Sequence, residues 1–356
     1  MLIAFFLFYL LAIWSVDKSA KLQTKLLEAT CIVFVVMIGS RNPLIWDDTE
    51  VYVQSFRMSP TIFEFNTGEP IGFAEPFLYI VGCVVKVFSS NYTVYLTVIA
   101  SMAMFLLYKS MRQYCIFPLL GMCDYIARFM MNRDFMQIRS SICILLIVYS
   151  LYLIKERRPW EFFLVVFGAY FIHHMAIIAI PFYFLYNMKL KKYQIYLLLI
   201  VAFIFAIYGS GMIAEWAEAN SDDLDYSTYV TDEYRHESAE KGLANPLIYI
   251  QVLILLIFVS MENRLKSFSN YYIFRNGYLY ASLIMIVFSQ YTALSSRTSA
   301  MFTTLECFML PMILLGFKKE QRFLFYIPYG IVLMGVFYMK FYILYHTRNP
   351  EATLLW

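Results

Sequence analysis

Long apolar runs separated by short clusters of lysine and arginine set the pattern of this chain from end to end. A helix that crosses a bilayer takes about 20 apolar residues, and basic clusters beside such helices favour the cytoplasm. The pattern predicts an all-α polytopic membrane protein with about twelve transmembrane segments, some of them short, and with both termini outside. Ten of these crossings are expected at residues 1–16, 26–40, 93–108, 114–131, 141–154, 193–208, 246–261, 271–292, 299–316 and 323–345.

The apolar segment 160–187 accounts for the two remaining crossings. It lies between the basic clusters Lys155–Arg158 and Lys189–Lys192, which both belong inside under the charge rule. The chain must therefore cross an even number of times between them, although each half is shorter than the roughly 20 residues of a simple span. We expect a short hairpin that dips to the outer face and carries His173 and His174 at its tip.

A second short apolar segment, residues 76–90, lies between an outer loop and the next crossing. A crossing here would put the later cluster around Lys109 on the wrong side, so we expect the segment to lie on the outer face or to re-enter from it. No separate soluble domain is expected. Residues 1–356 should form a single integral membrane domain, with 41–90 as the first outer loop and 209–245 as a large acidic outer loop.

The composition agrees with this interpretation and excludes other classes. The chain is 61% hydrophobic, well above the apolar share of an ordinary soluble domain. The net charge of +3 is spread over short clusters and forms no continuous basic patch, so nucleic acid is not an expected partner. The 6 cysteines show neither metal-ligand spacing nor a disulfide framework, and no cofactor is expected.

Several arginines fall on the outer side of the membrane in this topology. A guanidinium fork matches phosphate oxygens bidentately, so arginines that converge at a membrane boundary suit the pyrophosphate of a membrane-anchored lipid. The alternative is that each arginine extends to the interface and binds ordinary lipid phosphates. The arginines assigned to the pyrophosphate are Arg41, Arg133, Arg139 and Arg297, and Arg235 lies in the acidic outer loop.

Candidates for proton transfer lie on the same side. Histidine suits a general base because its side chain titrates near neutral pH, although His173 could equally be a hydrogen-bonded structural residue. A zinc site lacks a third nearby ligand. Asp47 and Asp48 could form a metal-binding pair or simply begin a helix. A sugar linked to pyrophosphate is already activated, so no metal is predicted if arginines take up the charge.

The order and spacing of these residues resemble a known family. Arg41, Asp48 with Tyr52 four residues later, Glu75-Pro76, the run IRSSICILLIVYSLYLIKERR, the run AYFIHHMAIIAIP and SSRTSAMF together look like the EpsG-like branch of bacterial Wzy-type polysaccharide polymerases. The most specific part is Ile138-Arg139 followed about thirty residues later by Phe171-Ile172-His173. The positions that match the family pattern are Arg41, Asp48, Tyr52, Glu75, Arg139, His173 and Arg297. Members commonly carry a glycine shortly before the aspartate, which this chain lacks, so Asp47 and Asp48 both stay candidates, and His174 falls at a position that the pattern leaves open.

The resemblance implies an inner-membrane polymerase for O-antigen, capsule or exopolysaccharide, with a fold similar to the multi-span GT-C type. Such an enzyme transfers the growing glycan from undecaprenyl pyrophosphate to the non-reducing end of a new lipid-linked repeat unit at the periplasmic face. Its partners would be the two lipid-linked oligosaccharides and the membrane lipid, with a chain-length regulator protein as a further candidate. In these terms His173, or else Asp48 or Glu75, takes the proton, and Tyr52, His174 and Arg235 contact the acceptor or the covering loop.

Two other functions stay open at this stage. A ligase would move finished glycan onto lipid A core, and a flippase would carry the same lipid-linked glycan across the membrane. A flippase is expected to line both halves of a central pathway with ionisable residues. Here the long polar loops are outside and the inner ones are short and basic, which favours catalysis at the outer face.

Overall fold

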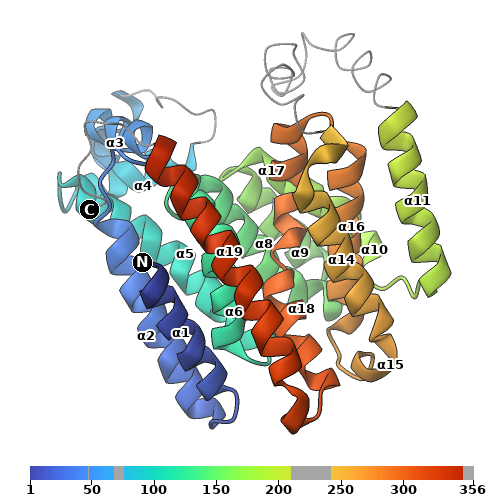
Figure 1. The fold of residues 1–356 in the computed structure, drawn as a ribbon. Coiled ribbons are helices and arrows are strands. Elements are labelled where there is room, and N and C mark those ends of the chain that lie inside the picture. The colour runs from blue at the N-terminus through green and yellow to red at the C-terminus, as the bar shows by residue number, and fades with distance from the viewer. Residues whose placement is uncertain (47, 68–75, 210–241, 348–356) are drawn as a thin grey trace. The chain divides into compact units, whose positions relative to one another are not determined.

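The computed structural model of the chain describes residues 1–46, 48–67, 76–209 and 242–347, and every regular element in these ranges is a helix (Figure 1). The predicted all-α class is therefore confirmed. The chain divides into two compact units, unit 1 with Met1–Ile177 and Phe317–Trp356, and unit 2 with Ile178–Gly316.

Fewer helices than expected have the length and hydropathy of a full membrane span. Among the described residues, four qualify on their own: Ala20–Gly39, Tyr92–Tyr114, Ile138–Lys155 and Lys319–Leu344. A fifth span would join Leu294–Thr303 to Glu306–Gly316 across a bend of 50°. The other apolar helices are shorter, so these findings support a membrane protein while the count of about twelve crossings stays a prediction.

Unit 1 is organised around α8 (Ile138–Lys155). In its apolar window 72% of the residues are buried, against 28% for α2 and for the span that contains α19, so α8 is central and the other two face outward. It packs against α5 and α9. The helices of this unit are α1 Leu2–Ser15, α2 Ala20–Gly39, α3 Thr49–Met58, α4 Phe77–Lys86, α5 Tyr92–Tyr114, α6 Pro118–Tyr125, α7 Met131–Arg133, α8, α9 Pro159–Tyr170 and α19 Phe323–Thr347, with short turns at η1 Ile62–Thr67, η2 Ile126–Met130 and η8 Lys319–Gln321.

The chain reverses direction tightly after α8. Arg157 adopts a left-handed backbone with φ 57°, and Pro159 occupies the first turn of α9, where its missing N–H has no helical partner in any case. The 12-residue α9 then runs back along α8 and ends close to the start of that helix. The hairpin expected for residues 160–187 stays a prediction.

The segment 76–90 forms a helix that is too short for a full crossing, as expected. It forms α4, a helix of 10 residues, which at 1.5 Å per residue is about half as long as a bilayer core is thick. It packs on α3, η1 and α5. Lys86 at its end donates a hydrogen bond to the Arg57 carbonyl at 2.9 Å and lies over the Phe56 ring. These contacts tie α4 to α3 and agree with a helix that does not cross.

Unit 2 is organised around α16 (Tyr271–Val287), which packs against α10, α11, α14, α17 and α18. One predicted site residue of this unit lies in a different kind of element than expected. Arg297 lies inside α17, whereas the sequence placed it in a turn between two crossings. The other helices of this unit are α10 Ala179–Leu185, α11 Lys192–Tyr208, α14 Pro246–Ser260, α15 Glu262–Leu265, α17 Thr292–Thr303 and α18 Glu306–Ile313, with η3 His174–Ile178 at the boundary with unit 1.

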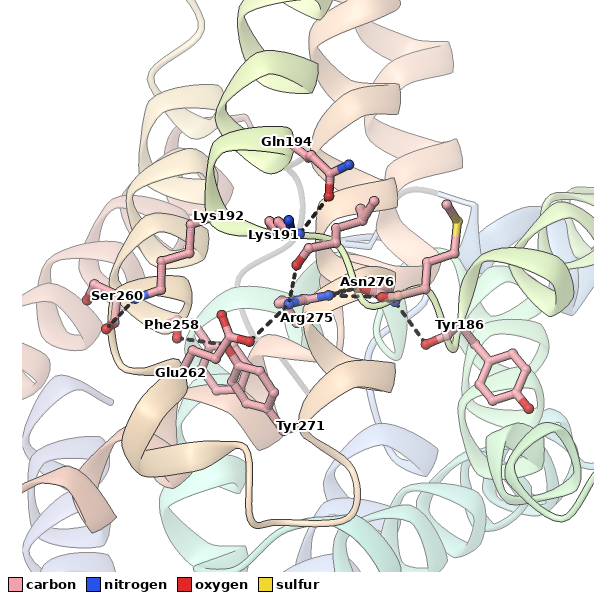
Figure 2. A network of polar contacts seen from close by, with 12 residues as sticks. Tyr186, Lys191, Lys192, Gln194, Phe258, Ser260, Glu262, Tyr271, Arg275 and Asn276 are labelled. Carbon is pink, nitrogen blue, oxygen red and sulfur yellow. Dashed lines mark hydrogen bonds and ion pairs between the residues drawn. The ribbon is translucent and has the colours of Figure 1, made fainter.

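A buried arginine fixes the loop before α11 to the first turns of α16 (Figure 2). Arg275 has no exposed surface and donates to the carbonyl oxygens of Met188 and Leu190 at 3.0 and 3.1 Å. It also donates to the Asn276 side chain and lies 3.7 Å from the Glu262 carboxylate. The Asn276 amide donates to the carbonyls of Leu185 and Tyr186 and, together with Arg275, to that of Met188, so this cluster satisfies buried backbone groups where three helices meet.

Candidate functional site

Arg41 is held in the core of unit 1 directly after α2 ends. Gly39 lets α2 approach α5 closely, since a Cβ there would lie 2.9 Å from the Thr97 Cα. Arg41 is 1% exposed, donates from Nη1 to the Ile38 carbonyl at 2.7 Å, and donates from Nε to Thr49 Oγ1 at 3.2 Å. These bonds fix the guanidinium plane through two of its three nitrogens.

The third nitrogen of Arg41, Nη2, has no hydrogen-bond partner among the described residues. Burial lowers the pKa of this guanidinium to about 10, so Arg41 is still charged at neutral pH. A buried charged donor without an acceptor is costly in a folded protein, and such groups indicate an absent ligand or a site for chemistry. An anion at Nη2 would remove that cost.

Asp48 and Tyr52 lie at the start of α3, beside the arginines that the sequence selected. Asp48 adopts a left-handed backbone with φ 60° at the N-cap and its side chain is exposed, while Tyr52 is 1% exposed. Arg139, in the first turn of α8, hydrogen-bonds the Tyr52 hydroxyl. Burial and the nearby Asp48 raise the pKa of Tyr52 to about 12 despite Arg139 and Arg41, so the phenol keeps its proton at neutral pH.

His173 lies toward the same end of α8 as Arg139. The Cys143 thiol, one helical turn or about 6 Å along α8 from Arg139, approaches the His173 carbonyl oxygen at 3.7 Å. His173 is half-buried, and the ring of His174 stacks on Tyr170 with centroids 4.5 Å apart. The return of α9 along α8 therefore brings the histidine pair close to the arginine despite some thirty intervening residues.

Asp134 belongs to this site although the sequence did not indicate it. Its carboxylate accepts hydrogen bonds from Tyr125 at 2.8 Å and from Ser141 at 2.6 Å. Burial raises the pKa of Asp134 to about 6, against the opposing effect of these hydrogen bonds and of the nearby Arg133 and Arg41. The signal in the sequence was weak because Asp134 directly follows a basic residue and precedes an apolar run.

A short chain of hydrogen bonds joins Arg41 to the turn that contains Asp134. Thr49 Oγ1 accepts from Arg41 and donates to the Phe135 carbonyl at 3.0 Å. Arg133 is 6% exposed, with its guanidinium 4.1 Å from the centre of the Phe129 ring. The turn between α7 and α8 thus contributes Arg133, Asp134 and a carbonyl to the surroundings of Arg41.

The described residues of unit 1 do not include four of the predicted site residues. Arg297 is half-buried on α17 and belongs to unit 2. Asp47, Glu75 and Arg235 lie outside the described residues. Their roles stay predictions of the sequence.

No three histidine, cysteine or acidic side chains within the described ranges are placed to hold a metal ion. The chemistry that the unit 1 cluster offers is binding of an anion by Arg41 and Arg139, close to the exposed Asp48 carboxylate, with His173 toward the same end of α8 as Arg139. Such a cluster can hold a phosphorylated leaving group close to a proton acceptor.

Comparison with known proteins supports the resemblance found in the sequence. Neither the curated proteins nor the solved structures offered a match, so a GT-C-like fold stays a prediction. The model of the EpsG family, by contrast, matches residues 25–350, a range that includes every candidate site residue named above. Family membership favours a function like that of the Wzy-type polysaccharide polymerases. The chain belongs to the EpsG family.

Proposed function

We propose that this protein is a glycosyltransferase of the bacterial inner membrane that polymerises lipid-linked repeat units of O-antigen, capsule or exopolysaccharide. The donor is the growing glycan on undecaprenyl pyrophosphate, and the acceptor is the non-reducing-end sugar of a new lipid-linked unit. The reaction takes place at the periplasmic face. The observation that carries this proposal is the buried Arg41, whose Nη2 has no partner in the described ranges, close to the matching positions Asp48, Tyr52 and Arg139.

The proposed reaction is a single displacement at the anomeric carbon. A hydroxyl of the acceptor sugar forms the new glycosidic bond while the bond from the anomeric carbon to the pyrophosphate oxygen breaks. The electron pair goes to the lipid pyrophosphate, where Arg41 and Arg139 stabilise the developing charge. The hydroxyl proton goes to His173, or to Asp48, whose exposed carboxylate is the other described candidate.

The arrangement of Arg139 and His173 supports a shared pocket. Both lie toward one end of α8, as the Cys143 contact indicates, and a shared pocket requires both to open to the periplasm. Single cysteines at positions 139 and 173, introduced after replacement of the native cysteines, should both react with a membrane-impermeant maleimide added to intact spheroplasts. Labelling of the two positions from opposite faces would remove the proposed mechanism.

Reconstitution tests the activity directly. Purified protein in nanodiscs, given a defined undecaprenyl-pyrophosphate repeat unit, should produce a ladder of lengthening glycans, with the same ladder in EDTA. The Arg139→Ala protein should insert normally and give no long chains. Arg158→Ala is the matched control, because Arg158 is an exposed arginine at the other end of the α8–α9 pair whose carboxylate partners are Glu156 and Glu161. A normal ladder from Arg139→Ala would remove Arg139 from the mechanism.

The surface glycan of a deletion strain separates this function from a ligase. A strain without the polymerase still attaches one repeat unit to its lipid A core, whereas a strain without the ligase attaches none. A flippase predicts accumulation of the lipid-linked unit on the cytoplasmic side and no ladder in the reconstituted assay.

A further inference from the structure

An apolar groove of about 440 Å³ separates α1 from α2 in unit 1. Its sides are helical stripes in which residues recur every three or four positions, such as Ala4 and Phe8 on α1 and Ala29, Val33 and Met37 on α2. Side chains of η2, α7 and α19 also line it. α1 itself packs on α6 and α19, while α2 packs on α5 and α6. Other helices of unit 1 therefore hold α1 and α2 on either side of the groove.

The groove opens to the outer surface of unit 1. Val33 in its wall is 55% exposed, and Ala29 next to it is also exposed. Small side chains at Ala4 and Ala29 keep the opening wide on both sides. Because α2 is one of the helices with the length and hydropathy of a membrane span, this surface faces hydrocarbon in a bilayer. An apolar chain could thus enter sideways from the membrane.

One end of the groove, at Met37 and Phe135, lies next to the candidate site. Met37 lies four residues before Arg41, and Phe135, which lines the groove, has its carbonyl bonded to Thr49 and through it to Arg41. The Phe135 ring also lies 4.4 Å from the Trp46 ring. Trp46 is 4% exposed and its indole Nε1 has no partner among the described residues. Two buried N–H donors, on Arg41 and Trp46, thus lie next to this end of the groove, and neither has an acceptor in the part of the chain that the structure describes.

From this juxtaposition we infer that the groove between α1 and α2 holds the hydrocarbon tail of a polyprenyl pyrophosphate whose head group binds at Arg41. Apolar walls exclude a polar ligand from the groove, while the unpartnered donors require an anionic or strongly accepting group at its end. An amphiphile with a long tail and a phosphorylated head satisfies both. The inference rests on the proposed function and adds to it the side from which the lipid-linked substrate enters.

Photolabelling tests the position of the tail. The probe is a polyprenyl pyrophosphate that carries a benzophenone on its tail, added to the purified full-length protein in nanodiscs. Crosslinked peptides should come from α1 and α2, and unlabelled undecaprenyl pyrophosphate should compete at least tenfold better than phosphatidylglycerol. Equal competition by phosphatidylglycerol would identify a groove for ordinary bilayer lipid and overturn the inference, as would labelling that maps mainly to other helices.

Substitutions in the groove provide a matched comparison. Ala29→Phe places a ring in the opening and should reduce labelling at least fivefold. Ile32→Phe adds a ring on the same helix at a position that is 64% exposed and does not line the groove, and should change labelling less than twofold. Ala4→Phe blocks the opposite wall and should reproduce the effect of Ala29→Phe if that variant fails to fold. Unchanged labelling in folded groove variants would overturn the inference.

The labelling and the polymerisation assay fail independently. Labelling of the groove with preference for the pyrophosphate, but no glycan ladder, would leave the lipid site standing and refute the polymerase. A glycan ladder that Ala29→Phe and Ala4→Phe leave unchanged, together with labelling elsewhere, would refute the groove alone.

Discussion

Two buried arginines, one in each unit of this protein, differ in whether their N–H groups all find hydrogen-bond acceptors. Arg275 in unit 2 uses Nε, Nη1 and Nη2 as donors, lies near the Glu262 carboxylate, and has the Tyr272 ring 4.9 Å from its guanidinium carbon. Arg41 in unit 1 is as deeply buried but leaves Nη2 without a partner among the described residues. An arginine that is fully satisfied by its own chain acts as a structural tie, whereas one with a spare donor can bind a ligand. Burial alone does not separate these two roles.

The largest expected effect is the loss of stability when Arg275 is replaced by alanine. Arg275→Ala removes the arginine partner of the Leu190 carbonyl and of the Glu262 carboxylate and one of the two donors to the Met188 carbonyl, so we expect a loss of about 3–5 kcal/mol in stability. The melting temperature of the purified protein in nanodiscs should fall by about 10 °C. Arg264→Ala, which removes an exposed arginine in the same unit, is the control and should change stability by less than about 1 kcal/mol.

Arg41→Ala should show the opposite balance between activity and stability. It removes two hydrogen bonds and a buried charge that the chain satisfies incompletely, so stability should fall by only about 1–3 kcal/mol. Glycan formation should fall by at least about 100-fold, because the leaving group loses a preorganised cation. The ladder assay and a melting curve on the same preparation measure both. Normal polymerisation by Arg41→Ala would show that its spare donor has no part in the reaction.

His173→Ala sharpens the assignment of the proton acceptor. A general base contributes roughly 100-fold or more, and Asp48 is an alternative acceptor, so we expect a reduction of about 10- to 100-fold in the rate of ladder formation. Arg158→Ala is again the control, since that exposed arginine pairs with Glu156 and Glu161 at the other end of the α8–α9 pair. Its rate should stay within about threefold of the native rate. Retained product length and rate in His173→Ala would demote His173 to a structural role.

The smallest expected effect concerns the pH dependence of the stability of unit 1. The raised pKa of Asp134 means that folding favours its protonated form, so this contribution to stability is present below pH 4 and is lost as pH rises through about 6. The melting temperature should therefore fall between pH 5 and pH 7.5 by an amount that Asp134→Asn reduces. An identical pH slope in Asp134→Asn and in the native protein would contradict the assignment of this titration to Asp134.

The sequence selected candidate site residues because the chemistry restricts residue types, and their roles stay predictions. Arg41, Asp48, Tyr52, Arg139 and His173 were selected from charge sidedness and family spacing, and the structure brings all five to unit 1. The sequence also placed residues 76–90 outside the set of full crossings, in agreement with the 10-residue α4. It failed at Arg297, where the polar run SSRTS was taken for a turn although it is part of α17.

What the sequence determined by itself is the class of the protein, because 61% hydrophobic residues in runs between basic clusters allow only a helical membrane protein. What only the tertiary structure decided is the state of each buried polar group. Asp134 and Arg275 were not recognised, and Arg41 could not be told apart from an arginine that extends to the interface. Hydrogen-bond satisfaction depends on partners such as Thr49, Phe135 and Met188 from other elements, and a linear pattern of charge and hydropathy carries no information about such contacts.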